Sequence, residues 1–415
     1  MDKYIINGGR SLEGSVKVER AKNAVLPFLA GAILSDEVTT ILDCPKILDV
    51  LSMIKILQSI GCKTNFEGNN LIIDPSNIFK DEIKHDLTKE LRSSVFMLGG
   101  LLSRLKTAKI AYPGGCDIGL RPIDMHLNAF RQLGVVVEDY PSEIYCHTDK
   151  VLGNKIYLDF PSVGVTENVM ILSAISDGET IIFNPAKEPE IVDLMNFLNQ
   201  MGAKISGAGK DEIHIIGVKK LHGTVYKPIG DRIEAGTLLV AGAITGGEVE
   251  VSGVKPEILG SLLNKFLNNT CNINIKSDII YLKSGSRRKG FVIETNPYPG
   301  FPTDLQAQML SLACVSEGVS IIRENIFETR FKHVQELVKI GADVVVKDRT
   351  AIIKGVKNFI GGEVYSKDLR GGASLVLAGL NAKGTTIVHD IKHVERGYYR
   401  FDEKLRSLGG DIKKL

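Results

Sequence analysis

The sequence predicts an α/β protein built from six repeats of about 70 residues. Two phrases recur along the chain with the same period. One is a helical segment followed by an apolar residue, a glycine and a short strand. The other is a helix of small apolar residues followed by a polar turn and a β-branched strand. A single repeat could not bury its apolar helix alone, so the repeats must pack against one another.

The first phrase predicts six amphipathic helices and the points at which they end. Its marker residue is a glycine in five of the six copies, and successive markers lie 68 to 73 residues apart. Glycine adopts left-handed backbone at little cost, so it commonly ends a helix just before a strand. The predicted helix ends are Gly61, Gly134, Gly202, Cys271, Gly341 and Gly409.

The second phrase predicts six apolar helices with polar residues at their openings. Helix N-termini present unpaired N–H groups and the positive end of the helix dipole, so anions bind there readily. For the acidic and hydroxyl residues, ordinary N-capping is the competing interpretation. Lysine and arginine do not fit capping, and three cations at equivalent openings predict a shared anionic ligand. The openings lie at Lys22 with Asn23, Arg92, Ser162, Asp231, Asp304 and Arg370.

Composition restricts the class of protein. The 415 residues suffice for two or three domains, and the formal net charge is only +2. Lysine and arginine are spread along the chain, which argues against nucleic-acid or membrane partners. No signal peptide is visible, and the longest nearly apolar run, "AVLPFLAGAIL", is too short to span a membrane. We therefore expect a cytoplasmic protein.

The six cysteines form no CxxC pair and no zinc-like spacing, so no metal site is predicted. Cys116 differs from the others because it lies in the turn-rich stretch "AYPGGCDIGLRPIDMH", close to Arg121. A thiolate in such a loop would be stabilised and able to react, although an unpaired cysteine is more often an inert apolar residue. His126 closes the same stretch without an Asp-His-nucleophile pattern, so we expect it on the helix surface or in a supporting role.

Several long motifs resemble one family of enzymes. They are "AKNAVLP", "PGGCDIGLRPID", "KEPEIVDLMNFL", "GDRIEAGTLLVAGA", "FPTDLQAQ", "FETRFKHVQEL", "DLRGGASLVLAG" and "VERGYYRFDEKLRSLGG". In this order they resemble the UDP-N-acetylglucosamine 1-carboxyvinyltransferases, from the first strand to the C-terminus. The resemblance implies a two-domain inside-out α/β barrel of six repeats, with the active site in the cleft between the domains. It also implies a discontinuous domain, residues 1–21 and 230–415, and an inserted domain, residues 22–229.

The resemblance further implies a reaction. Such enzymes transfer the enolpyruvyl group of phosphoenolpyruvate to the 3-hydroxyl of UDP-N-acetylglucosamine by addition and elimination, with release of phosphate and without a cofactor. This is the first committed step of peptidoglycan precursor synthesis. The sister transferase acting on 3-phosphoshikimate is an alternative, but it typically lacks the PGGC loop. A non-catalytic sugar-nucleotide sensor on the same fold is a second alternative. The oligomeric state is not predicted.

The motif positions that match the family carry its residue roles. Lys22 with Asn23, Arg121 and Arg396 would hold phosphoenolpyruvate mainly through its phosphate, and Arg330 and Arg370 would face its carboxylate. Asp304 would be the base near the sugar hydroxyl. Cys116 would donate a proton to the methylene carbon, form a covalent adduct with phosphoenolpyruvate and be alkylated by fosfomycin. The catalytic group is thus Cys116, Asp304, Lys22 and Arg396.

The sugar nucleotide would lie against a second group of residues. One departure is that "LDFPSVG" places Phe160 and Pro161 where some relatives carry a lysine, which removes one cation near the nucleotide. The implied contacts are Arg92, Arg121, Pro122, Ile123, Asp124, Met125, Ser162, Val163, Gly164, Asp304 and Ile326.

Overall fold

The computed structural model describes residues 2–114, 123–268, 271–284 and 288–415. The described chain forms two compact units, each held together by its own contacts. Unit 1 contains residues 2–19 and the chain from residue 230 onward, and unit 2 contains the described residues from 20 to 229. None of the described helices is long and apolar enough to cross a membrane.

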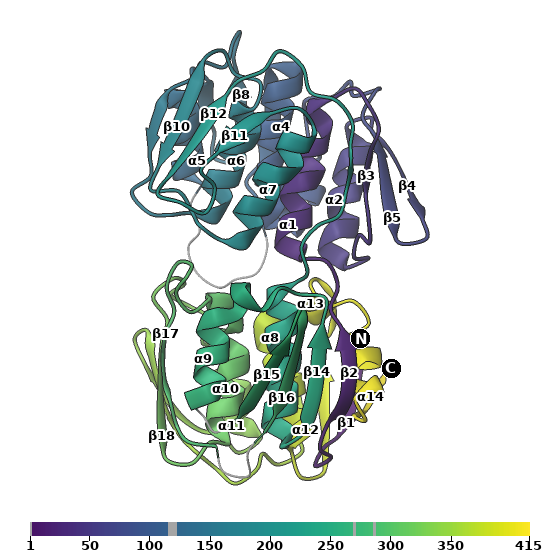
Figure 1. Cartoon of the computed structure of the whole chain (residues 1–415), viewed down its shortest axis with the longest axis vertical. Coiled ribbons are helices and arrows are strands. Elements are labelled where there is room, and N and C mark those ends of the chain that lie inside the picture. The colour runs from purple at the N-terminus through teal and green to yellow at the C-terminus, as the bar shows by residue number, and fades with distance from the viewer. Residues whose placement is uncertain (1, 115–122, 269–270, 285–287) are drawn as a thin grey trace. The chain divides into compact units, whose positions relative to one another are not determined.

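Three apolar helices pack against one another at the centre of each unit (Figure 1). Every residue of α12 is buried, as is every residue of α10, so these helices have no solvent face. A helix that is apolar all round is stable only inside a protein, which explains why it forms the core here. The central helices are α8 (Arg232–Thr245), α10 (Gln306–Cys314) and α12 (Leu369–Asn381) in unit 1, and α1 (Lys22–Gly31), α4 (Phe96–Leu105) and α6 (Val163–Ser173) in unit 2.

Three small sheets surround the helices of unit 1, in the orders β15-β16-β14-β2, β17-β18-β20-β19 and β21-β22-β1-β23. The first strand of the chain, β1, pairs antiparallel with both β22 and β23, close to the other end of the chain. The strands are β1 (Lys3–Asn7), β2 (Glu13–Lys17), β14 (Glu248–Ser252), β15 (Asn272–Lys276), β16 (Ile279–Lys283), β17 (Val292–Glu294), β18 (Val319–Arg323), β19 (Asp343–Lys347), β20 (Thr350–Lys354), β21 (Glu363–Tyr365), β22 (Thr385–His389) and β23 (Asp411–Lys414).

Unit 2 repeats this arrangement with the sheet orders β13-β3-β5-β4, β6-β8-β7 and β11-β12-β10-β9. Its strands are β3 (Thr39–Ile41), β4 (Lys63–Glu67), β5 (Asn70–Asp74), β6 (Thr107–Ala111), β7 (Val136–Asp139), β8 (Glu143–His147), β9 (Lys155–Tyr157), β10 (Glu179–Phe183), β11 (Lys204–Ser206), β12 (Glu212–Ile216) and β13 (Val225–Tyr226).

Amphipathic helices precede the edge strands, as the first phrase predicts. They are α2 (Leu48–Ser59), α5 (Asp124–Gln132), α7 (Pro189–Gln200), α9 (Gly260–Asn268), α11 (Val334–Lys339) and α14 (Phe401–Ser407). The five glycine markers all have positive φ, between 83° and 113°, so they end their helices in left-handed backbone. The predicted fold class, an α/β protein of six repeats, is confirmed.

Short helical segments complete the chain. They are η1 (Ala32–Leu34), α3 (His85–Glu90), η2 (Arg92–Val95), η3 (Pro256–Leu259), η4 (Thr303–Leu305) and α13 (Lys392–Glu395).

Candidate active site

In unit 1, the Asp304 carboxylate lies between two buried arginines. Its Oδ1 accepts a hydrogen bond from Arg330 Nη2 at 2.8 Å, and its Oδ2 accepts one from Arg370 Nη2 at 2.9 Å. The arginine side chains are 4% and 3% exposed, whereas that of Asp304 is 26% exposed. Two fixed cations therefore converge on one carboxylate that solvent still reaches.

Local geometry explains how these side chains converge. Asp304 lies in η4, where no side chain caps the backbone, so the N-capping interpretation is wrong for this residue. Arg370 lies in the first turn of α12, and its backbone N–H is capped by Asp368 at 3.0 Å. The cap and Asp304 together offset the unfavourable position of a cation at the positive end of the helix dipole.

Tyr398 supports Arg370 from the side. The Arg370 guanidinium lies 5.4 Å from the centre of the Tyr398 ring, and the Tyr398 hydroxyl lies 2.8 Å from Thr237 Oγ1. Gln308 Nε2 donates to the backbone oxygen of Asp304 at 2.9 Å, and it lies 3.1 Å from both the Thr237 and the Tyr398 hydroxyl oxygens, which share its second hydrogen. Burial opposes the charge on Arg370, but the Asp304 carboxylate outweighs it and raises the pKa of Arg370 above its usual value.

Two further predicted residues of unit 1 lie on short segments. The Ile326 backbone N–H donates to Glu324 Oε1 at 2.9 Å, and the Thr303 hydroxyl donates to Glu324 Oε2 at 2.9 Å. This buried glutamate therefore fixes both the Ile326 turn and the start of η4. Arg396 follows the last residue of α13 and is half-buried.

In unit 2, Lys22 is the first residue of α1 and its Nζ lies 2.7 Å from Asp49 Oδ2. The two side chains are 13% and 5% exposed. Sequence analysis missed Asp49, although a carboxylate in the first turn of the largely apolar helix α2 was a usable signal. Asn23 follows Lys22 and is half-buried.

His126 lies inside unit 2 and not on a helix surface, so that part of its prediction is wrong. Its Nδ1 lies 3.1 Å from Asn168 Nδ2, which must donate, so the ring proton belongs on Nε2. Burial, with a contribution from nearby Arg92, lowers the pKa of His126 to about 3. His126 is therefore a neutral hydrogen-bond acceptor from Asn168 at neutral pH.

The remaining nucleotide-binding predictions fall at two helix openings. Ser162 caps α6 by accepting from the Val165 N–H at 3.5 Å, and Asp231 caps α8 by accepting at 2.8 and 2.9 Å, so N-capping is confirmed for both. A Cβ added to Gly164 of α6 would lie 3.4 Å from the ring of His126 in α5, so the openings of α5 and α6 lie close together within unit 2. Val163 is half-buried beside Gly164; Ile123 is buried, Met125 is half-buried and Asp124 is exposed.

Buried carboxylates lie near this part of unit 2. Glu167 on α6 is buried, and burial together with Glu190 and Glu188 raises its pKa well above the usual value. Burial also raises the pKa of Asp193 on α7 to about 6, even though Asp193 accepts hydrogen bonds from the Tyr226 hydroxyl and the Ile229 N–H. Burial therefore favours the protonated form of Glu167 and makes Asp193 a weaker acid than an exposed aspartate.

Three predicted site residues, Cys116, Arg121 and Pro122, lie outside the described residues. The other five cysteines are buried, and burial raises the pKa of Cys44, Cys62, Cys146 and Cys314 to about 12. They match the expectation of inert apolar residues. Among the described residues, no group of three or more metal-binding side chains comes together.

Comparison with known proteins places the chain in a family. The model of the EPSP synthase (3-phosphoshikimate 1-carboxyvinyltransferase) family matches residues 6–405. The chain belongs to this family. Within it, the chain is 49% identical to UDP-N-acetylglucosamine 1-carboxyvinyltransferase 2 of Caldanaerobacter subterraneus subsp. tengcongensis and 45% identical to the enzyme of that name from Clostridium tetani, each with all of both chains covered.

Solved structures of the family share the fold. The enolpyruvyl transferase NikO from Streptomyces tendae has a TM-score of 0.90 at 23% identity, over 100% of this chain and 99% of its own. EPSP synthase from Acinetobacter baumannii has a TM-score of 0.76 at 18% identity, with both chains fully covered. The enolpyruvyl transferase fold inferred from the motifs is therefore confirmed.

Proposed function

We propose that the chain transfers the enolpyruvyl group of phosphoenolpyruvate to the 3-hydroxyl of UDP-N-acetylglucosamine, with release of phosphate, in the first committed step of peptidoglycan precursor synthesis. Full-length relatives that carry this enzyme's name are 44–49% identical, whereas the EPSP synthase structures are 18–19% identical. The Asp304 carboxylate between Arg330 and Arg370 is the structural observation that carries the proposal. The sugar nucleotide is thus favoured over 3-phosphoshikimate as acceptor.

Asp304 is proposed to accept the proton of the sugar hydroxyl. Its ionised carboxylate is held in place by both arginines and remains partly exposed, as a general base must be. Each guanidinium has five N–H donors, so the bond that each arginine donates to Asp304 leaves other donors to face the carboxylate of phosphoenolpyruvate. We assign Arg330 and Arg370 this second function.

The addition forms a bond between the sugar oxygen and C2 of phosphoenolpyruvate, while the methylene carbon takes up a proton from Cys116. The elimination breaks the bond between C2 and the phosphate oxygen, and the methyl group returns a proton to the Cys116 thiolate, which leaves the enol ether. Lys22 with Asn23, Arg121 and Arg396 are proposed to bind the phosphate and stabilise its departure. Asp49 orients Lys22 through their ion pair. No cofactor or metal is needed for these steps.

The sugar nucleotide is proposed to contact the openings of η2, α5 and α6. Arg92 supplies a cation, and Ser162 with Gly164 supplies backbone N–H groups at the start of α6. The N-terminal turn of α5 carries Ile123, Asp124 and Met125, which follow Arg121 and Pro122 in the sequence. Asp304 and Ile326 of unit 1 are also proposed to contact the sugar nucleotide.

The test is phosphate release from phosphoenolpyruvate with UDP-N-acetylglucosamine, with 3-phosphoshikimate and without an acceptor. Release with the sugar nucleotide alone is the expected result. Release with 3-phosphoshikimate alone would show that the proposed acceptor is wrong, although phosphoenolpyruvate would remain the donor. Tight nucleotide binding without phosphate release would instead identify a sugar-nucleotide sensor.

The role of Cys116 has a separate test. Intact mass after fosfomycin treatment is expected to show one adduct, because the epoxide alkylates a reactive thiolate. Cys116→Asp is expected to remove the adduct, whereas Cys146→Ser, at a buried cysteine, is expected to keep it. An adduct that persists in Cys116→Asp would assign the reactive thiol elsewhere.

A further inference from the structure

In one of the sheets, each of the four strands contributes an aliphatic side chain to a continuous exposed row. In the sheet β17-β18-β20-β19 of unit 1, the register places Val292 beside Ile321, Ile321 beside Ile352 and Ile352 beside Val345. These four side chains, the outer row, are 54%, 38%, 48% and 61% exposed. A continuous row of β-branched aliphatic side chains facing solvent across a whole sheet marks an interaction surface.

The edge strand β19 shows the difference between the sheets most clearly. Val345 lies four residues after the marker Gly341, at the centre of β19. On each of the other edge strands, the residue that matches Val345 on the outer face of its sheet is polar, as is usual where a sheet edge is protected from pairing with other chains. These residues are Asn65, Glu138, Ser206, Asn274 and Lys413.

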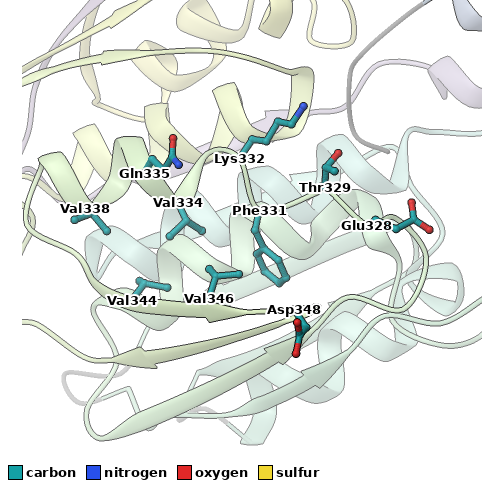
Figure 2. Close-up of a pocket in the computed structure, with 10 residues that line it drawn as sticks. All are labelled: Glu328, Thr329, Phe331, Lys332, Val334, Gln335, Val338, Val344, Val346 and Asp348. Carbon is teal, nitrogen blue, oxygen red and sulfur yellow. The ribbon is translucent and has the colours of Figure 1, made fainter. Parts of the chain in front are cut away.

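The inner side of the same edge is also open. Val344 and Val346 on β19 face Phe331 and Val334 across a groove of about 580 Å³, as Figure 2 shows. Val346 is 39% exposed although it points to the inner side of the sheet. The edge strand therefore presents apolar side chains on both faces, together with the backbone N–H and C=O groups that alternate residues turn away from β20.

The sequence of β19 is complementary to itself. It reads Asp-Val-Val-Val-Lys, and both charged ends are exposed. When two copies pair antiparallel about Val345, Asp343 of each copy lies opposite Lys347 of the other, and Val344 lies opposite Val346. Opposite charges directly across an antiparallel pair stabilise it, and a two-fold axis applies this twice.

We propose that β19 pairs with β19 of a second copy of this chain, so that two four-stranded sheets become one continuous sheet across a two-fold axis. The outer rows then join at Val345, and the grooves beside Val344 and Val346 lie next to the new strand. Because only five residues a side form the ladder, we expect a weak dimer with a dissociation constant of about 10–100 µM.

Charge reversal at the strand ends tests this pairing. Asp343→Lys places two lysine pairs across the axis and Lys347→Asp places two aspartate pairs there, so each variant alone is expected to dimerise about tenfold more weakly than the wild type. In an equimolar mixture, the two variants restore both opposite-charge pairs, so a heterodimer of wild-type strength is expected. Sedimentation velocity at micromolar to millimolar protein concentrations measures the dissociation constant of each variant and of their mixture.

Two further variants complete the design. Val345→Lys places two lysines at the axis and is expected to abolish the dimer, while Lys276→Asp on the edge strand β15 is a matched control that leaves it unchanged. Retained enolpyruvyl transfer by each variant would show that it folds. A wild-type chain that stays monomeric throughout, or a dimer insensitive to the charge reversals, would overturn the proposal.

Discussion

The two units bury their charges in different ways. In unit 1, Asp304 is matched by two arginines, so opposite charges meet. In unit 2, Lys22 is matched by Asp49, but Glu167 lies near Glu188 and Glu190, so carboxyl groups also meet one another. A buried ion pair remains charged because each partner replaces lost water, whereas clustered buried carboxyl groups hold protons instead. Unit 1 should therefore be sensitive to loss of the Asp304 charge, while the buried carboxyl groups of each unit should make stability depend on pH.

The largest expected effect comes from Asp304→Asn. This change removes the proposed base and leaves two buried guanidinium groups without an anion. We expect kcat to fall by about 10²–10⁴-fold and the free energy of unfolding to fall by about 3 kcal/mol. Phosphate release and urea unfolding measure the two effects. Asp278→Asn, at an exposed aspartate of the same unit, should change neither, and near-normal kcat in Asp304→Asn would exclude its role as base.

Lys22→Arg is expected to separate binding from stability in unit 2. Arginine keeps the ion pair with Asp49, so the free energy of unfolding should change by less than about 1 kcal/mol. The broad guanidinium cannot reproduce the compact ammonium group, so KM for phosphoenolpyruvate should rise by about tenfold. Lys55→Arg, on the exposed side of α2, is the control. An unchanged KM in Lys22→Arg would argue against a direct phosphate contact.

The two units should lose stability over different pH ranges. Burial raises the pKa of Asp193 in unit 2 from 3.8 to about 6 and that of Glu234 in unit 1 from 4.5 to about 7. The folded chain thus binds more protons than the unfolded chain within these ranges, so stability falls as pH rises through them. For Asp193 the loss should be about 2–3 kcal/mol between pH of about 4 and 6.

Urea unfolding at a series of pH values measures this dependence. Asp193→Asn should remove the change in the free energy of unfolding over the lower pH range, and Glu234→Gln should remove it over the upper range. Neither amide side chain titrates. If both variants retain the wild-type slope, other groups must carry the pH dependence.

The smallest expected effects concern the helix caps. Asp231 accepts two N–H groups at 2.8 and 2.9 Å, whereas Ser162 accepts one at 3.5 Å. We expect Asp231→Ala to lower the free energy of unfolding by about 1–2 kcal/mol and Ser162→Ala by about 0.5 kcal/mol. Urea unfolding at constant pH checks the order, and a larger loss in Ser162→Ala would contradict it.

The fold could be predicted because it follows from a short sequence pattern that repeats along the chain. A glycine after each amphipathic helix needs only its own backbone conformation, and five such glycines have the left-handed conformation expected of them. The N-cap interpretation succeeded for Ser162 and Asp231 for the same reason. Asp304 resembles a cap in its local sequence, and only the folded chain shows that its carboxylate binds arginines instead.

The ion pairs could not be predicted from the residues around them. Asp304 is 26 residues from Arg330 and 66 from Arg370 along the chain, so the fold alone brings them together. Asp49 was missed because no local pattern in the sequence indicates that it forms an ion pair with Lys22. The assignment of Lys22, Asn23, Arg92, Arg396 and the Cys116 loop to substrates rests on motif resemblance, and it stays a prediction.

The place of β1 between β22 and β23 sets an order of events during protein synthesis. The ribosome makes residues 3–7 first, yet their neighbours in the sheet are residues 385–389 and 411–414. Unit 2 can begin to fold once residue 229 has left the ribosome, since domains commonly fold as they emerge. The earliest residues of the chain must instead wait, unpaired, until translation is nearly finished.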